Sequence, residues 1–383
     1  MRVSMICCPF QTSYGVYASS LIAAIENRTS CPVQWVGSNC GCGDPIETNR
    51  QYQAQKCDYF EMPVLGDYRS TQAWKREARS LARSVLFSAR ARRFSRLSRG
   101  ADVVHFQQIL NAYGSKTVFA WLKQPSDAVR VVTVHELDAD QQNAKAANAT
   151  YNRANAILVH CQELKDQLIK LNVQPEKIHV VLHGTPLPER SSGPRSGIVF
   201  CGGHKLMTNK GLDTLLQALA TLKQRMGDRA PVLSVHGHYG FDTPVEAIEL
   251  AQKHGVTDKV AWLNQIPQGE VSKLYQRSLL CVLPYVGSFA GGAAGHAAAC
   301  ELPVIGTRRA GLPDHLGDAG IWVEERNVAQ LADRIEHLLI DEAARKQAGE
   351  RCFERAQKYL GWDVIAEQTL QIYANSNGRA KAA

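Results

Sequence analysis

The sequence predicts an α/β protein with two domains, each built around a parallel β-sheet. Short apolar runs alternate with amphipathic helical patterns along most of the 383 residues, and this alternation is typical of parallel sheets that helices cover on both faces. The length exceeds what a single hydrophobic core usually supports. A stretch rich in Pro, Gly and Ser at residues 186–197 interrupts the alternation near the middle of the chain, and we expect the domain boundary there.

The first half opens with a predicted strand, a loop and a helix. Residues 2–8 are apolar but too short a run for a secretory signal, residues 9–15 form the loop, and the spacing over 16–26 predicts a helix. In open α/β sheets, ligands bind at loops like this one, which follow the carboxyl ends of strands. No GxGxxG motif follows a predicted strand, so the pattern argues against a dinucleotide-dependent dehydrogenase. Residues 27–70 predict an irregular region with some β structure.

Residues 74–99 form a strongly basic segment. They hold nine Lys or Arg side chains against one acid, Glu77, with apolar residues interleaved. A basic amphipathic helix of this kind can lie on an anionic membrane surface or bind an anionic acceptor. It can equally be a solvated helix whose apolar side packs on its own domain. The segment lacks a recognition fold or an aromatic platform for nucleic acid, so we expect no nucleic-acid partner.

Two later strand patterns each carry a histidine at or near the end, His105 in residues 101–106 and His135 in residues 131–135. A histidine at the carboxyl end of a buried strand can donate to a sugar hydroxyl or a phosphate oxygen. The alternative role is a structural hydrogen bond. The predicted first domain is completed by a strand at 154–161, a helix at 163–171 and a strand at 177–186.

The second half begins with the stretch around which the functional argument is built. An apolar strand pattern at 198–200 leads into Gly202 and Gly203, and Lys205 and Lys210 then bracket the start of a helix. Free N–H groups, the positive end of the helix dipole and two ammonium groups all favour a phosphate at such a turn. The alternative is an ordinary strand-to-helix turn with solvated lysines. The helix should bury the face formed by Leu212, Leu215, Leu216 and Leu219.

The strand-and-helix rhythm continues to the end of the chain. Apolar runs predict strands at 232–236, 260–267 and 279–283, and helical spacing predicts helices at 246–254, 270–277, 331–340 and 362–373.

The segment Gly203-x-Lys205-x4-Lys210-Gly211 resembles the G-R/K-x4-K-G segment of the family 4 retaining glycosyltransferases, which have the GT-B fold. That resemblance implies two Rossmann-like parallel-sheet domains that face each other across a cleft, with a C-terminal helix that crosses back to the N-terminal domain. The implied parts are an acceptor domain at 1–188, a linker at 189–197, a donor domain at 198–358, the crossing helix at 359–376 and a disordered tail at 377–383.

The resemblance also implies roles for particular residues. In the family, two basic residues hold the diphosphate of a nucleotide-sugar donor, and these match Lys205 and Lys210, while a histidine beside the donor sugar matches His135. These three are therefore the expected catalytic residues. The diphosphate would also contact glycine-rich backbone, and the base would lie near a strand-end turn. The matching positions are Gly15, Gly203, Gly291, Gly292 and Ala293 for the diphosphate, and Gln265 and Ile266 for the base.

The chain departs from the family at its most diagnostic motif. Residues 284–305 resemble a segment with two glutamates eight residues apart, and these positions hold Ser288 and His296 here. In the family, the glutamates contact the transferred sugar and the ribose. His296 can still donate or accept a hydrogen bond at the ribose, whereas Ser288 is shorter and uncharged. A serine and a histidine at these positions fit either a subfamily with another donor or a degraded site.

The sequence therefore predicts a retaining, metal-independent hexosyltransferase-type enzyme that takes a sugar from a UDP- or GDP-linked donor and needs no other cofactor. Its acceptor would be a glycan, a glycolipid or a small molecule. Two alternatives stay open. One is a non-catalytic GT-B protein that partners an active transferase, and the other is a nucleotide-sugar epimerase or hydrolase.

Composition limits where such a protein works. The net charge of +8 suits acidic partners such as phosphates or anionic lipids. No apolar run approaches the roughly 20 residues that a membrane-spanning helix needs. Eleven cysteines, an odd and scattered number, favour reduced thiols rather than a disulfide framework. We expect a cytoplasmic protein, with a peripheral position on the inner face of the membrane if residues 74–99 bind lipid.

Overall fold

The computed structural model describes residues 1–7, 13–29, 32–38, 57–60, 74, 100–108, 127–137, 151–202, 209–237, 245–264, 266–287, 291–309 and 311–380. The chain divides by its internal contacts into two compact units. The first unit comprises residues 1–181 together with 362–383, and the second comprises residues 182–361. Each unit contains its own parallel sheet.

The sheet of the first unit has seven strands in the order β3-β2-β1-β4-β5-β6-β7. Every neighbouring pair is parallel. The strands are β1 (Val3–Cys7), β2 (Val33–Ser38), β3 (Cys57–Phe60), β4 (Val103–Gln107), β5 (Val129–Val134), β6 (Ala156–Val159) and β7 (Ile178–Val180). Strands β1, β4, β5 and β6 are buried along their whole length, which explains why most of their residues are apolar. The strand order reverses at β1, between β2 and β4, and ligands bind at such switch points in open α/β sheets.

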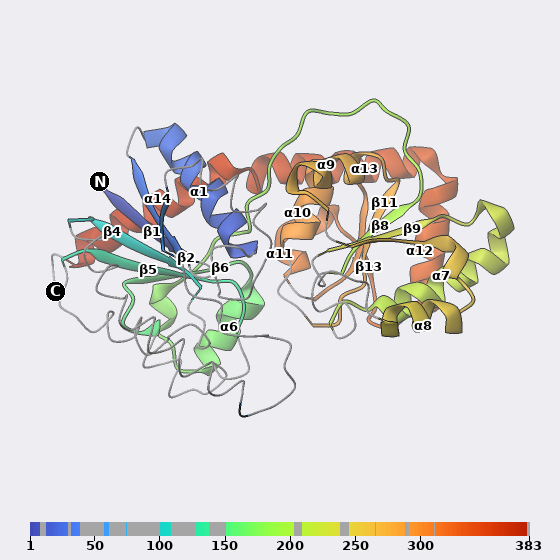
Figure 1. Cartoon of the computed structure of the whole chain (residues 1–383), viewed down its shortest axis with the longest axis horizontal. Helices are drawn as coiled ribbons and strands as arrows, with labels where there is room; N and C mark the ends of the chain where they lie inside the picture. The colour runs from blue at the N-terminus through green and yellow to red at the C-terminus, as the bar shows by residue number, and fades with distance from the viewer. Residues whose placement is uncertain are drawn as a thin grey trace. The chain divides into compact units, whose positions relative to one another are not determined.

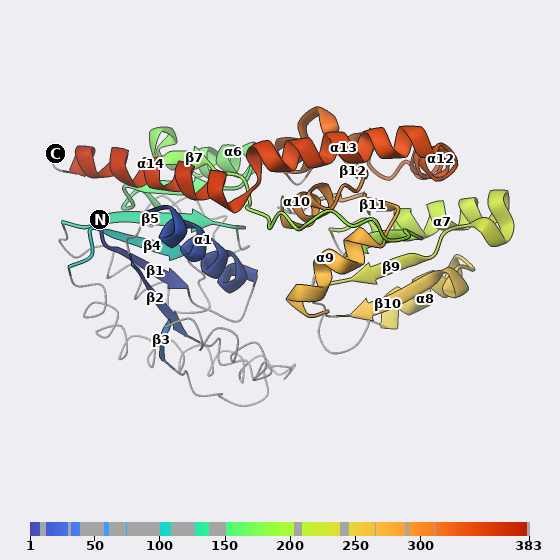
Figure 2. The ribbon, with the colours of Figure 1, turned by 90° about the horizontal axis from the view of Figure 1, so that it is seen from above.

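The helices of the first unit whose bounds lie within the described residues are α1 (Ser13–Thr29), α6 (Gln162–Lys170), the 3-10 turn η3 (Pro175–Lys177) and α14 (Trp362–Ala380). Helix α14 is the last helix of the chain, yet it lies beside α1 and also contacts β5 and β6 (Figures 1 and 2). The Tyr17 and Trp362 rings meet edge to face with centroids 5.1 Å apart, and Arg28 forms an ion pair of 3.0 Å with Glu367.

The sheet of the second unit has six parallel strands in the order β10-β9-β8-β11-β12-β13. The strands are β8 (Ile198–Cys201), β9 (Leu233–His236), β10 (Val260–Asn264), β11 (Leu280–Leu283), β12 (Val304–Thr307) and β13 (Ile321–Val323). The α-helices are α7 (Leu212–Met226), α8 (Val245–Lys253), α9 (Gln268–Gln276), α10 (Gly291–Ala299), α11 (Leu312–Leu316), α12 (Val328–Ile340) and α13 (Glu342–Tyr359). The short 3-10 turns are η5 (Gly227–Arg229), η6 (Thr257–Lys259) and η7 (Gly317–Ala319). In Figure 1, α9, α10 and α11 lie on one side of this sheet and α7, α8 and α12 lie on the other.

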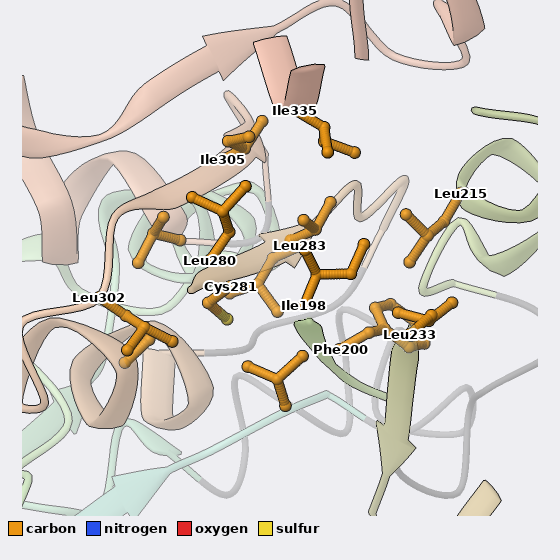
Figure 3. Packing of buried hydrophobic residues seen from close by; sticks show 14 of the residues in the cluster. Ile198, Phe200, Leu215, Leu233, Leu280, Cys281, Leu283, Leu302, Ile305 and Ile335 are labelled. Atoms are coloured by element: carbon orange, nitrogen blue, oxygen red, sulfur yellow. The ribbon is translucent and has the colours of Figure 1, made fainter. Parts of the chain in front are cut away.

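The core of the second unit fills the space between its sheet and helices. Strand side chains such as Ile198, Phe200 and Leu283 meet Leu215 of α7 and Ile335 of α12 (Figure 3). The predicted leucine face of α7 is buried throughout. This confirms the periodicity argument, because only the apolar stripe of an amphipathic helix needs a partner.

The observed elements follow the predicted alternation, with one shorter strand. The pattern at 177–186 predicts a strand, but β7 ends at Val180. The last ladder bond runs from the Val181 N–H to the Val159 carbonyl at 2.8 Å, where the neighbouring strand also ends. The Pro-, Gly- and Ser-rich stretch at 186–197 contains neither helix nor strand.

The basic segment at 74–99 lies outside the described residues, except for Trp74, whose side chain is exposed. Among the helices that the structure describes, none combines the length and the apolar character needed to cross a bilayer.

Candidate functional site

The candidate site of the second unit lies at the switch point of its sheet, where β8 pairs with β9 on one side and β11 on the other. The loops after β8 and β11 are joined by backbone hydrogen bonds. The N–H groups of Val286 and Gly287 donate to the Asn209 carbonyl at 3.0 and 3.3 Å. Gly211 has φ +69°, and a Cβ there would overlap the Pro284 carbonyl oxygen. Glycine is therefore required for the two loops to approach this closely.

Lys210 is buried beside these loops, with only 8% of its surface exposed. Its Nζ lies 3.9 Å from the centroid of the Tyr285 ring, a cation–π arrangement. The Tyr285 hydroxyl donates to the Cys201 carbonyl at 2.7 Å, and the Thr307 hydroxyl donates to the Tyr285 carbonyl. Burial raises the pKa of Tyr285 well above its usual value, so the ring is a neutral phenol. The face of the Tyr285 ring thus stabilises the ammonium group of Lys210, which the sequence predicts to bind phosphate.

The amino end of α10 follows β11 and opens with Gly291, Gly292 and Ala293. The His315 ring packs directly against Gly291, so a Cβ at that position would overlap the imidazole. His315 donates from Nδ1 to the Gly311 carbonyl at 2.8 Å and accepts at Nε2 from the His183 N–H at 3.0 Å. Burial lowers the pKa of His183 and of His315 to about 4. Neutral imidazoles therefore line the first turn of a helix whose N–H groups can bind an anion.

His296, which stands at the position of the second family glutamate, lies on α10. Its ring stacks on Tyr275 with centroids 5.9 Å apart, and its Nε2 is 3.5 Å from the Ser272 hydroxyl. The Tyr275 hydroxyl is in turn 3.0 Å from Nε2 of His236. Burial lowers the pKa of His296 to about 4, so the ring is neutral near pH 7. A neutral imidazole can share a hydrogen bond with a ribose hydroxyl, which remains a prediction for this side chain.

Several predicted site residues lie outside the described part of the chain, namely Gly203, Lys205, Gln265 and Ser288. Ile266, which follows Gln265 in the sequence, is described and half-buried. Gly15 is buried in the first turn of α1. The described residues contain no group of three His, Cys, Asp or Glu side chains that could hold a metal ion.

In the first unit, His135 follows β5 and is held by side chains from two other strand ends. Its Nε2 lies 3.1 Å from Oε1 of Gln107, and its Nδ1 lies 3.0 Å from Nε2 of His160. The Tyr14 ring stands 4.7 Å from the His135 ring, and the Tyr14 hydroxyl donates to Oε1 of Glu136 at 2.7 Å. The carboxyl ends of β4, β5 and β6 thus bring polar side chains together at one edge of the sheet.

Sequence reasoning identified His135 but missed Tyr14, Gln107, Glu136 and His160. Each of the last three lies at or next to the carboxyl end of a strand, and Tyr14 lies in the first turn of the helix after β1. The signal that could have found them is therefore their position along the predicted strands.

Two family models match the chain. The model described as "Glycosyltransferase Family 4" matches residues 59–187, and the model described as "Glycosyl transferases group 1" matches residues 195–341. The chain belongs to this glycosyltransferase family. The first match ends at residue 187 and the second begins at residue 195, both close to the division between the units after Val181. The two families correspond to the resemblance seen in the lysine motif and in residues 284–305.

Characterised relatives and solved structures agree with this assignment. A D-inositol 3-phosphate glycosyltransferase from Kribbella flavida is 28% identical over 240 residues, which cover 57% of this chain and 56% of the relative. The match thus spans little more than half the length of that relative. Sucrose-phosphate synthase from Thermosynechococcus elongatus has a similar structure, with a TM-score of 0.76 at 20% identity over 98% of this chain and 99% of that one.

HepE from Anabaena, in a structure with UDP-glucose, gives a TM-score of 0.72 at 12% identity over 97% of this chain and 99% of that one. At such identities the structural likeness establishes the fold alone. Family membership and fold together confirm the expected GT-B class, with two parallel-sheet units of the Rossmann type.

Proposed function

We propose that this protein is a glycosyltransferase that moves a sugar from a nucleoside-diphosphate donor to an acceptor, with the donor bound by the second unit. The observation that carries the proposal is that the buried Lys210 follows β8 and the glycine-opened helix α10 follows β11, and these two strands are neighbours at the switch point of the sheet. A buried ammonium group and unsatisfied helix N–H groups are the chemistry that a diphosphate requires. Membership of a glycosyltransferase family supports the same reading.

The proposed roles follow the positions of the residues. Lys205 and Lys210, with the backbone of Gly203, Gly291, Gly292 and Ala293, would hold the diphosphate. Gly15, in the first turn of α1, is a further proposed contact. His296 would contact the ribose and Ser288 the transferred sugar. Gln265 and Ile266 would contact the base. We infer retention of configuration without a metal, because ammonium groups and helix N–H groups can neutralise the charge of the departing diphosphate.

The acceptor is proposed to bind the first unit. A glycan, a glycolipid or a small polar molecule each fits the polar strand ends around His135. Because the relatives described above are D-inositol 3-phosphate glycosyltransferases, a phosphorylated polyol is also a candidate. The basic residues at 74–99 suit such an anion or an anionic membrane surface. On that proposal the protein works in the cytoplasm, at the inner face of the membrane when the acceptor is a lipid.

A second candidate function is a catalytically inactive partner of another transferase. The observation that favours it is the replacement of both family glutamates by Ser288 and His296. The two candidates differ in one measurable property, which is turnover of a nucleotide sugar in the presence of acceptor.

The first experiment measures thermal unfolding with UDP, GDP, ADP and their sugars. A ligand at a hundred times its dissociation constant stabilises the folded state by about 2.7 kcal/mol, which raises Tm by several degrees. We expect one nucleoside diphosphate to do so, and Lys210→Ala to abolish the shift. Lys273→Ala is the matched control, because that lysine is exposed on α9 and pairs with Glu270. If no nucleotide shifts the transition, the donor site does not exist.

Turnover is then measured with the sugars of the stabilising nucleotide and a panel of acceptors, and the anomeric configuration of the product is read by NMR. A retained configuration in the presence of a chelator supports the full proposal. Tight nucleotide binding without transfer or hydrolysis would favour the inactive partner.

A further inference from the structure

The segment that opens the second unit, residues 183–196, contains neither helix nor regular strand, yet it is bonded to the rest of that unit. Near its start, the Thr185 N–H donates to the Leu360 carbonyl at 2.8 Å. At its end, the Ser196 N–H donates to the Arg277 carbonyl at 2.7 Å. These residues, called the connecting segment below, are therefore fixed to the second unit at both ends.

The connecting segment also contacts α10, the helix whose first turn is proposed to bind the diphosphate. A Cβ at Gly292 would lie 3.5 Å from the His183 ring, and a Cβ at Gly295 would lie 3.5 Å from Cβ of Thr185. The two glycines are three positions apart, so they lie on the same face of the helix. The beginning of the connecting segment covers that face of α10.

Helix α10 depends on such contacts for its shape. Three of its nine residues are glycines, and each glycine destabilises a helix because it loses more backbone freedom on folding than any other residue. A helix of this length is also too short to be stable alone. Its first-turn N–H groups are arranged for an anion only while the helix is formed, so the contacts that hold α10 also prepare the proposed donor site.

The C-terminal end of α10 closes on a residue in an unusual conformation. The Glu301 N–H donates to the Ala298 carbonyl at 3.1 Å. The Leu302 N–H donates to the Ala297 carbonyl at 3.0 Å, which completes the pattern of a Schellman cap. The left-handed position of this cap is usually glycine, yet here it is Glu301, with φ +58°. A side chain kept at such a strained position indicates a role for that side chain.

The Glu301 carboxylate lies against two arginines of the connecting segment. Its Oε1 is 2.9 Å from Nε of Arg190, and its Oε2 is 4.0 Å from Nη2 of Arg195. Arg195 also donates to the Cys300 carbonyl at 3.1 Å, at the end of the helix where carbonyls lack intrahelical partners. The Arg190 guanidinium lies over the Phe353 ring of α13, 4.5 Å from its centroid. Glu301, Arg190 and Arg195 are called the Glu301 clamp below.

We propose that the three residues of the Glu301 clamp are positioning residues for the donor. They hold the connecting segment against α10 and thereby keep the first-turn N–H groups of α10 arranged for the diphosphate. The nine residues of α10 span only about 13 Å, so a restraint on its last turn and on one face also restrains its first turn. The proposal rests on the proposed glycosyltransferase function for its ligand, but the clamp itself does not.

Glu301→Gly separates the clamp from the helix cap. Glycine adopts the left-handed conformation freely, so the cap is kept and the urea midpoint should change little. The ion pairs are lost, so the nucleoside diphosphate that stabilises the wild-type protein (UDP, GDP or ADP) should bind about 3–5-fold more weakly. Calorimetry measures this affinity. Wild-type affinity, or a loss of affinity only in step with a lower urea midpoint, overturns the proposal.

A variant that combines Arg190→Gln and Arg195→Gln opens the clamp from its other side. It should weaken nucleotide binding by a similar factor, and adding Glu301→Gly should cause little further loss, because residues that act as one unit have non-additive effects. Losses that multiply in the triple variant contradict the clamp. Arg225→Gln is the matched control. It breaks ion pairs of 2.7 and 2.9 Å between α7 and α12, on the other side of the sheet from α10, and should leave the affinity unchanged.

Trypsin provides a readout that needs no ligand, because it cleaves after Arg190 and Arg195. Release of the connecting segment makes these two bonds accessible, so Glu301→Gly should be cut there about 3–5-fold faster than the wild-type protein. Mass spectrometry of the fragments identifies the two sites, and Arg225→Gln should be cut there at the wild-type rate. Unchanged cleavage in Glu301→Gly overturns the proposal whether or not the protein binds a nucleotide. If cleavage is faster but no nucleoside diphosphate binds the wild-type protein, the proposed function fails and the clamp on α10 stands.

Discussion

At the scale of single residues, two glycines of the second unit do different work although both lie in the first turn of a helix. Gly291 is the first residue of α10, and the His315 ring occupies the space that a Cβ would fill there. At Gly269 in α9, no atom lies within 4 Å of the position that a Cβ would take. The need for glycine at position 291 therefore comes from a neighbour that is close in space and distant in sequence.

Gly291→Ala should lower the free energy of unfolding by about 1–3 kcal/mol, because the methyl group must displace His315 from its bonds to Gly311 and His183. Gly269→Ala should be neutral or stabilise by up to about 1 kcal/mol, since alanine favours the helix over the unfolded chain. Urea unfolding of both variants checks this. Equal effects of the two substitutions would contradict the packing argument.

The Lys210–Tyr285 contact gives a second prediction at this scale. Tyr285→Phe keeps the ring under the ammonium group and loses only the bond to the Cys201 carbonyl, for about 1 kcal/mol of stability. Tyr285→Leu removes the ring face as well. We expect nucleoside diphosphate to bind Tyr285→Phe with nearly wild-type affinity and Tyr285→Leu several-fold more weakly, measured by calorimetry. Weaker binding to the phenylalanine variant than to the leucine variant would rule out the cation–π support.

At the scale of elements, α12 and α13 are joined through one residue, Asp341. Its N–H donates to the His337 carbonyl at the end of α12, and its Oδ1 accepts from the Ala344 N–H in the first turn of α13 at 2.8 Å. Helix α13 packs on α10 and α11, which border the candidate site. Asp341 thus ends α12 and begins α13, so no separate turn connects the two helices.

Asp341→Ala should destabilise the second unit by about 1 kcal/mol, because an N-cap side chain satisfies a helix N–H that is otherwise unpaired. Asp341→Asn should lose much less, since its side-chain oxygen can make the same bond. The difference in urea midpoint between the two variants measures how much the cap hydrogen bond contributes to stability. An alanine variant as stable as the asparagine variant would show that the bond adds nothing.

At the scale of the whole molecule, burial holds five histidines of the described part of the chain in the neutral form. Burial lowers the pKa of His105 to about 3, and of His183, His236, His296 and His315 to about 4. An unfolded histidine titrates near 6.5, so between about pH 6.5 and 4 the unfolded chain binds more protons than the folded one. Stability is therefore complete above this window and is lost as the pH falls through it.

The free energy of unfolding should fall by about 1.4 kcal/mol per pH unit for each such histidine within that window. His236→Asn should reduce the slope by about one such increment, because it removes one buried ring. His337→Gln, an exposed position on α12, is the control and should keep the wild-type slope. Urea unfolding between pH 7.5 and 5 measures it, and a stability independent of pH would refute the assignment of neutral buried rings.

Much of the architecture was predictable from the sequence. A strand buried in a parallel sheet is apolar on both faces, so β6 and β11 appear as short unbroken apolar runs. The apolar face of α7 was equally predictable, because helical periodicity depends only on residues that are close in the sequence. The lysine motif identified Lys210 and Gly211, and residues 284–305 identified the opening of α10.

What only the tertiary structure decided is which side chains meet. Tyr285 under Lys210, His315 against Gly291 and the two hydrogen bonds of Gln108 to the backbone of His135 and Glu136 all join residues brought together by strand order. His105 and Tyr373 are 268 residues apart and bond at 2.6 Å because α14 returns to lie beside α1. A local pattern reports the burial of a residue and its secondary structure. The partner of a buried polar group is set by topology, because strand order brings together residues that are distant in sequence.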